Sequence, residues 1–131
     1  MRYLLDTSVC VDLLRARQPA LRRLAELGPD SVAISAMTVA ELIYGLYRAR
    51  AAYEAAERLD QFLSIIDVLA FDRSAAMHHA RARRALAVAG TPIGERDLVI
   101  ASVALAHGLT VATGNLREFR RVPALRVEEW A

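Results

Sequence analysis

The chain has 131 residues, of which 55% are hydrophobic, and its formal net charge is +2. These values predict one folded domain over residues 1–131 and exclude a disordered, highly charged chain. The single cysteine, Cys10, excludes an internal disulfide and a Cys-x-x-Cys metal site. No signal peptide is recognisable, and the apolar run at 98–106 is shorter than the roughly 20 residues that cross a bilayer. We therefore expect a cytoplasmic protein without membrane contact.

All 17 basic residues are arginine, and the chain contains no lysine. A GC-rich genome would produce this composition, yet each guanidinium still offers a planar pair of donors that matches a phosphate group. The absence of lysine excludes a P-loop nucleotide site, whose motif requires one. Receiver domains and haloacid-dehalogenase-like phosphatases normally place a lysine beside their aspartates, so the chain does not fit those classes either.

Short apolar segments alternate with segments of helical periodicity along the chain. Strands are predicted at residues 3–5, 31–35, within 65–70, at 109–112 and, as a last edge strand, at 124–127. Helices are predicted at residues 7–15, 19–27, 39–47, 72–90 and 94–107, with a further helix ending at about 59–66. This alternation predicts an α/β fold, in which a central, mostly parallel sheet of four or five strands carries helices on both faces.

Asp6 follows the first predicted strand and begins the first predicted helix. Asp, Thr and Ser are all favoured at helix N-termini, so Asp6-Thr7-Ser8 is explained equally well as a helix cap. In the functional interpretation, Asp6 holds a metal ion while the hydroxyls of Thr7 and Ser8 orient the carboxylate or its waters. The motif alone does not decide between these interpretations.

Glu41 lies in the helical pattern that follows the second predicted strand. With Thr38 it fits a T-x-x-E capping box, in which the glutamate bonds back to the Thr38 amide. Gly45, one turn further on, leaves space beside the same helix face, which favours a site role. The two roles are compatible, because a carboxylate in the first turn of a helix stays near the edge of the sheet.

Asp97 begins the nearly all-apolar helix before the fourth predicted strand. It shares a helix face with three small residues, Ala101, Ala104 and Gly108, which allow close packing against the sheet. An aspartate in the first turn of such a helix is expected to be partly desolvated at the sheet edge. Helix capping remains the alternative, since acids favour helix N-termini.

Thr113-Gly114-Asn115 follows the fourth predicted strand. Glycine and asparagine are common in turns, so an ordinary turn is one interpretation. In the functional interpretation, Thr113 and Asn115 add neutral oxygens at the same edge as the acids.

Asp6, Glu41 and Asp97 are each expected at the carboxyl end of a parallel strand, where open α/β sheets bind ligands. Three converging carboxylates form a hard-oxygen site suited to Mg²⁺ or Mn²⁺. The sequence therefore predicts a metal site of the kind that serves phosphodiester chemistry.

The order and spacing of these residues resemble a known family. The pieces are Asp6-Thr7-Ser8, Ala40-Glu41-Leu42 with Gly45, Ile93-Gly94 with Asp97 and Ile100-Ala101, and Thr113-Gly114-Asn115 with Glu118-Phe119. Together they resemble the PIN-domain family, specifically the VapC-like toxins of bacterial type II toxin–antitoxin pairs. The resemblance runs from residue 3 to about residue 127.

The resemblance implies a PIN-like three-layer sandwich and a Mg²⁺- or Mn²⁺-dependent endoribonuclease that hydrolyses RNA to arrest growth. In it, Asp6, Glu41 and Asp97 match the acidic metal-binding residues, and Asn115 stands where many PIN domains carry a fourth aspartate. The implied partners are RNA, a cognate antitoxin whose C-terminal segment covers the cleft, and a second copy of the chain in a homodimer. Two alternatives stay open: a PIN-type nuclease outside a toxin pair, and a non-catalytic α/β binding module.

Overall fold

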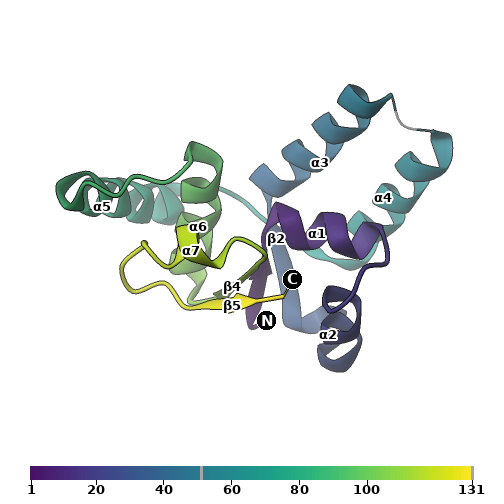
Figure 1. Ribbon diagram of the computed structural model, residues 1–131, viewed down its shortest axis with the longest axis horizontal. Coiled ribbons are helices and arrows are strands. Elements are labelled where there is room, and N and C mark those ends of the chain that lie inside the picture. The colour runs from purple at the N-terminus through teal and green to yellow at the C-terminus, as the bar shows by residue number, and fades with distance from the viewer. Residues whose placement is uncertain (51, 131) are drawn as a thin grey trace.

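The computed structural model describes residues 1–50 and 52–130. Five strands form one sheet in the order β3-β2-β1-β4-β5, and each neighbouring pair is parallel (Figure 1). The strands are β1 Tyr3–Leu5, β2 Val32–Ser35, β3 Asp67–Leu69, β4 Thr110–Thr113 and β5 Val127–Glu129. The predicted α/β fold with a parallel sheet is confirmed.

The helices occupy the connections between strands. They are α1 Thr7–Leu14, α2 Ala20–Leu27, η1 Pro29–Ser31, α3 Ala36–Ala49, α4 Tyr53–Ile65, α5 Arg73–Ala89, α6 Glu95–His107 and α7 Leu116–Phe119. The predicted cap of α5 is present, since the Asp72 carboxylate accepts a hydrogen bond of 3.0 Å from the amide of Ala75. None of the helices in the described part of the chain is long and apolar enough to cross a bilayer.

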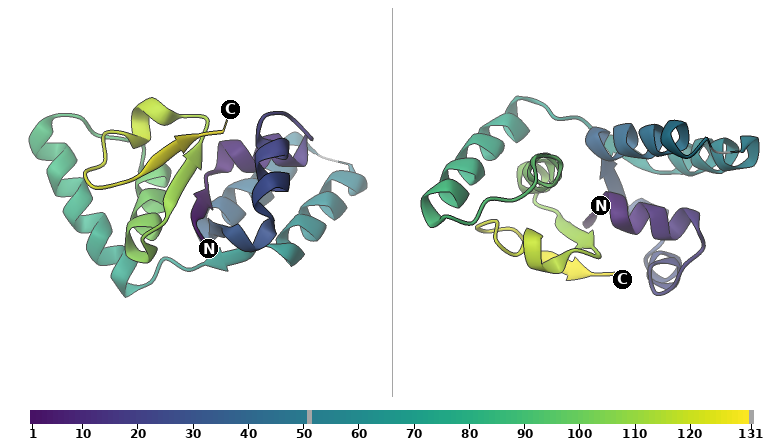
Figure 2. Two further views of the ribbon diagram at one scale, coloured as in Figure 1. Left: turned by 90° about the horizontal axis from the view of Figure 1, so that it is seen from below. Right: turned by 45° about the horizontal axis from the view of Figure 1, so that its top comes forward.

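Two hydrophobic cores lie on opposite faces of the sheet. Successive residues of a strand point to opposite faces, and accordingly Leu4 packs in one core and Leu5 in the other. The Leu4 core takes its helical residues from α5, α6 and α7, and the Leu5 core takes its own from α1, α2, α3 and α4. Figure 2 shows the sheet between these two groups of helices, which gives the predicted three layers.

The strand register brings three chain segments to one edge of the sheet. Leu5 lies opposite Ile34 of β2 on one side and opposite Ala112 of β4 on the other. The next residue, Asp6, remains bound to β4, because its amide donates a 2.9 Å hydrogen bond to the carbonyl of Ala112. The residues directly after β1, β2 and β4 therefore lie side by side at the carboxyl edge.

The last strand begins three residues later than predicted, at Val127 instead of residue 124. The chain turns first: Ala124 has a left-handed φ of 66°, and the amide of Leu125 donates to the carbonyl of Val122 at 3.3 Å. Helix α7 was not predicted, because four residues are too few to show helical periodicity.

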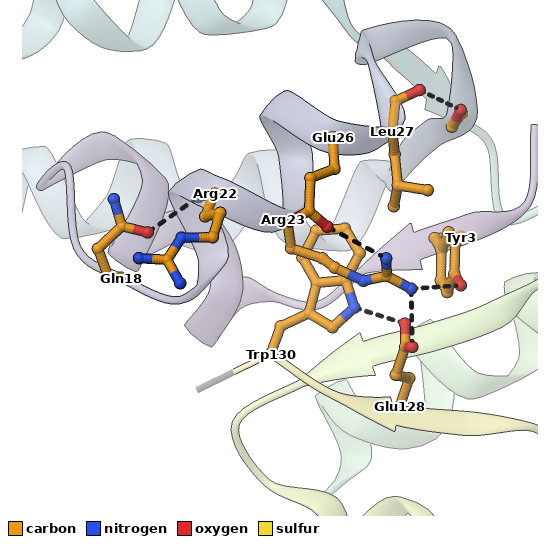
Figure 3. Close-up of polar contacts among 9 residues, drawn as sticks. Tyr3, Gln18, Arg22, Arg23, Glu26, Leu27, Glu128 and Trp130 are labelled. Carbon is orange, nitrogen blue, oxygen red and sulfur yellow. Dashed lines mark hydrogen bonds and ion pairs between the residues drawn. The ribbon is translucent and has the colours of Figure 1, made fainter.

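The C-terminal segment is held against α2 and β1 by aromatic and ionic contacts (Figure 3). The ring of Trp130 is almost fully buried and lies 5.4 Å from the ring of Tyr3. Glu128 accepts hydrogen bonds of 2.9 Å from Arg23 and 2.7 Å from the indole of Trp130. These contacts cover the edge of the Leu5 core with the end of the chain.

Candidate functional site

Asp6 lies at the centre of the carboxyl edge, where β1 passes into α1. One carboxylate oxygen, Oδ1, accepts hydrogen bonds from the amide of Val9 at 3.0 Å and the hydroxyl of Ser8 at 2.7 Å. The other, Oδ2, accepts a short hydrogen bond from the hydroxyl of Thr113 at the end of β4. The capping interpretation of Asp6 is therefore confirmed for Oδ1, while Oδ2 joins two strands.

The Asp6 side chain is 3% exposed, and this burial raises the pKa of its carboxyl above the usual value. The three hydrogen bonds oppose the shift because they favour the charged form. The nearby charge of Glu41 adds to the increase in pKa. Because burial and the charge of Glu41 both disfavour the ionised carboxylate, a bound cation would stabilise it.

Glu41 lies in the second turn of α3 and contacts α1. Its Oε1 accepts a 2.7 Å hydrogen bond from the hydroxyl of Thr7, and its Oε2 lies 3.7 Å from the guanidinium of Arg96. The predicted capping box is wrong, because α3 begins one turn earlier than its apolar pattern. Ser35 is the N-cap, and its hydroxyl accepts from the amide of Thr38 at 3.1 Å. Glu41 therefore takes no part in the helix cap, and its carboxylate binds Thr7 instead.

Asp97 lies in the first turn of α6, whose N-cap is Gly94 and carries no side-chain cap. The pKa of Asp97 is raised to about 7. Burial is the largest cause, and the charge of Glu118 is the second largest. The charges of Asp6 and Glu41 raise the pKa of Asp97 further, so the other three carboxylates of the edge all act on Asp97. The small residues expected behind Asp97 on the helix, Ala101 and Ala104, are fully buried.

Glu118, on α7, is a fourth acidic residue of this edge; it belongs to the sequence resemblance but was not among the predicted site residues. Its Oε1 accepts from the amide of Gly94 at 2.7 Å, and this bond is the main cause that lowers the pKa of Glu118. A hydrogen bond between Glu118 and Asp97 contributes to both shifts, because it lowers the pKa of Glu118 and raises the pKa of Asp97.

The predicted neutral residues lie around these acids. Asn115 donates through Nδ2 to Oε2 of Glu118 at 2.7 Å and therefore orients the fourth carboxylate. Thr113 accepts from the amide of Asn115 at 2.7 Å while it donates to Asp6. Ser8 accepts from the amide of Gly114 at 3.0 Å. These bonds connect the loop after β4 to the start of α1.

The donors present are those that a hard divalent cation prefers. Carboxylates and hydroxyls make up the site, and the nearest cation, Arg96, has a side chain that is 69% exposed. Across residues 1–50 and 52–130, no three acidic, histidine or cysteine side chains surround one point closely enough to hold a metal ion as they stand. The donor chemistry fits Mg²⁺ or Mn²⁺, and the carboxylates have to turn from their present hydrogen bonds to bind it.

The sequence of this chain is similar to those of characterised ribonucleases. A protein of Salmonella typhimurium named tRNA(fMet)-specific endonuclease VapC is 37% identical over 130 residues, which cover 99% of this chain and 98% of that protein. Ribonuclease VapC2 of Rickettsia felis is 34% identical over 132 residues, which cover 99% of this chain and 98% of that protein.

Solved structures are similar over the same length. VapBC2 from Rickettsia felis, bound to a DNA fragment from its promoter, contains a chain with a TM-score of 0.91 and 34% identity, and the match covers 100% of both chains. DNA-bound VapBC from Salmonella typhimurium gives a TM-score of 0.86 at 36% identity, with 100% and 99% covered. The PIN domain matches residues 3–125. The chain therefore belongs to the PIN-domain family and is a VapC-like member of it.

Proposed function

We propose that this protein is a metal-dependent endoribonuclease and the toxin of a type II toxin–antitoxin pair. The observation that carries the proposal is the Asp97 carboxyl, whose pKa is raised to about 7 first by burial and then by the charges of Glu118, Asp6 and Glu41. Such repulsion is unfavourable for the empty site and is relieved by a divalent cation. The relatives named ribonuclease or endonuclease VapC support RNA as the substrate.

Asp6 and Asp97 are the main candidates to hold Mg²⁺ or Mn²⁺, with Glu41 and Glu118 binding a water molecule or a second ion. When bound, such an ion polarises the scissile phosphate and lowers the pKa of a water molecule. Asp97 has to release its proton for this role. No side chain of the chain needs to form a covalent intermediate, because water is the nucleophile of the proposed hydrolysis.

The hydroxyl groups around the acids have a positioning role in this proposal. Thr113 and Ser8 hold the two oxygens of Asp6, and Thr7 holds Oε1 of Glu41. Each bond keeps one carboxylate at the edge of the sheet before the metal and the substrate arrive, so only a local rotation of the side chain is needed to complete the site. Asn115 acts in the same way on Glu118 and supplies no charge of its own.

The proposed partners follow from the relatives. Similar chains have been solved as VapBC and FitAB assemblies with DNA and as a toxin–antitoxin complex, so we propose a cognate antitoxin for this chain. We also propose a homodimer and a cytoplasmic location, where the RNA substrate is found. The continuous five-stranded sheet supports a single PIN domain over residues 1–131.

Purified protein incubated with total cellular RNA tests this proposal. Cleavage should require Mg²⁺ or Mn²⁺, stop in EDTA and return when the metal is restored. Asp6→Ala and Asp97→Ala should each abolish cleavage, whereas Glu95→Ala, an exposed acid on the same helix as Asp97, should cleave like the parent protein. Cleavage that persists in EDTA, or in both aspartate variants, would show that another chemistry or a contaminant is responsible.

A further inference from the structure

A groove of about 820 Å³ begins at the carboxylate site and is lined by α1, α3 and α4. Thr7 and Glu41 line the groove and also belong to the carboxylate site, so the two are continuous. Figure 1 shows α3 and α4 side by side next to α1, extending beyond the sheet. A polymer cut at the carboxylates has to continue away from them, and this groove offers a path.

The charged side chains that line the groove are mostly basic. Arg15 follows the last residue of α1, and Arg48, Arg58 and Arg96 come from α3, α4 and α6. Glu41, at the end nearest the site, is the one acidic residue among the described lining residues. The acids are thus concentrated where a metal would bind, and the arginines where the rest of a polyanion would lie.

Helices α1 and α3 carry their groove residues in the same order. Both helices start at the carboxyl edge, where Thr7 begins α1 and Glu41 lies in the second turn of α3. About two turns further on are Arg15, directly after α1, and Arg48. Seven or eight residues of helix correspond to roughly 10–12 Å along the axis. The groove therefore extends beyond the carboxylates along both helices. The arginines lie further along it, where phosphates next to the scissile one would pass.

Apolar side chains also line the groove, and they would favour binding of a single strand over a duplex. Val11, Leu14, Leu46 and Leu59 line it, and the ring of Tyr44 is 60% exposed beside them. Bases of a single strand stack on aromatic and apolar surfaces, whereas a duplex presents mainly its sugars and phosphates.

We infer that a single-stranded segment of the RNA substrate lies in this groove, with phosphates on Arg48 and Arg58 and a base on Tyr44. This inference rests on the proposed ribonuclease function and adds the path of the strand and its single-stranded form. Gly45 supports it, because a Cβ there would meet no atom within 4 Å, so the helix backbone is open to the groove.

Binding of a fluorescein-labelled ten-nucleotide RNA, measured by anisotropy on a non-cleaving Asp97→Asn background, tests the inference. Tyr44→Ala should weaken binding about 5-fold or more, the usual effect of losing one stacking partner. Arg48→Gln and Arg58→Gln should each reduce the slope of log K against log salt by about 0.7. Gly45→Leu should block binding without changing charge, and Gly45→Ala should interfere less.

Matched controls separate this effect from a general loss of charge or aromatic surface. Tyr47 is exposed on the same helix but does not line the groove, so Tyr47→Ala should bind like the parent. Arg22 is exposed on α2 outside the groove, so Arg22→Gln should keep the full salt slope. Melting temperatures should be similar throughout, because the substituted arginine and tyrosine side chains are exposed.

The same groove variants, made in the chain with Asp97 intact, separate this inference from the proposed function. If the parent chain cleaves RNA and the groove variants bind and cleave equally well, the groove serves a protein partner and the inference is wrong. Tighter binding of a ten-base-pair duplex than of the single strand would also overturn it. If the parent chain cleaves no RNA with either metal, the proposed function itself fails.

Discussion

The two carboxylate oxygens of Asp6 have separate functions. Oδ1 caps α1 through the amide of Val9, and Oδ2 binds Thr113 of β4. The bond to Val9 fixes the orientation of the Asp6 side chain and so keeps its carboxylate at the edge of the sheet. The capping and site interpretations of the Asp6-Thr7-Ser8 motif are therefore compatible, because the local bond prepares the functional one.

The stability of the metal-free protein should depend on pH through Asp97. The folded protein keeps a proton on Asp97 up to about pH 7, whereas an unfolded aspartate releases it near its ordinary pKa of 3.8. The stabilisation from this proton is therefore lost as the pH rises through about 7. In EDTA, the melting temperature should fall between pH 5.5 and pH 8. Asp97→Asn should flatten this dependence and raise the melting temperature at pH 8.

The same experiment, repeated with added metal, measures metal binding to the folded protein. Millimolar Mn²⁺ should raise the melting temperature by binding the folded state, and more strongly at pH 8 than at pH 5.5, because the proton on Asp97 competes with the ion. Asp97→Asn should weaken this response, and Glu95→Gln should leave it intact. A parent melting curve indifferent to Mn²⁺ at both pH values would contradict the metal site. Glu118, whose pKa is lowered, contributes only at more acidic pH.

Thr7 should affect turnover through Glu41. Removing the hydroxyl in Thr7→Ala frees the Glu41 carboxylate from its 2.7 Å bond and should reduce cleavage roughly 10–100-fold, as is typical for residues that orient metal ligands. Thr7→Ser keeps the hydroxyl and should restore most of the activity. Cleavage rates over a range of Mn²⁺ concentrations provide the measurement. Equal loss in both variants would indicate a packing effect and no orienting bond.

Most of the acidic edge could be predicted from the sequence, since Asp6, Glu41 and Asp97 each stand at a recognisable junction of strand and helix. Glu118 could not be predicted as a site residue in this way, because it lies in a helix of four residues, which is too short to show hydrophobic periodicity. The available signal was its place three residues after Asn115, one helical turn away. The structure shows that Glu118, and not residue 115, brings the fourth carboxylate to Asp97.

At the scale of elements, the sequence located the strands and helices well but their ends less well. Helix α3 starts at Ala36, earlier than the apolar pattern, because its first turn is fixed by the Ser35 cap and not by burial. Strand β5 starts later than predicted, because the left-handed Ala124 belongs to a turn. Both errors concern backbone hydrogen bonds that hydrophobic periodicity does not report.

The C-terminal segment should contribute strongly to stability through Trp130. Trp130→Ala removes a buried ring from the Leu5 core and should cost about 3–5 kcal/mol of unfolding free energy. Trp130→Phe keeps an aromatic ring but loses the indole donor to Glu128, so it should cost less. Urea unfolding followed by circular dichroism measures both. Tyr53→Ala, a largely exposed aromatic on α4, is the control and should change little.

For the whole molecule, the alternation of short apolar segments with helices was enough to predict the architecture. Parallel strands require crossover connections, and a sheet buried on both faces needs helices on each side. The strand order could not be obtained in this way, because the pairing of β1 with both β2 and β4 depends on long-range contacts. That central position of β1 is what makes Asp6 the meeting point of the site.

Expression of this chain alone in a bacterial host should arrest growth, and co-expression of its cognate antitoxin should restore it. Under the proposed function, cleavage of host RNA would stop growth, and the proposed antitoxin would prevent the arrest by blocking the acidic edge. Asp6→Ala and Asp97→Ala should remove the arrest because each loses a candidate metal ligand. Colony counts after induction, together with the soluble amount of each variant, provide the measurement.

The controls for the growth experiment decide between cleavage and general harm from expression. Glu95→Ala keeps the four carboxylates and should arrest growth as the parent does. Trp130→Phe, which keeps all four carboxylates and the backbone bond to Thr113, should also remain toxic if it folds. Growth arrest that survives both aspartate substitutions at equal protein levels would mean that toxicity does not come from the acidic edge. For Asp97→Ala, loss of arrest together with a melting temperature no lower than that of the parent chain would attribute the phenotype to chemistry and exclude misfolding.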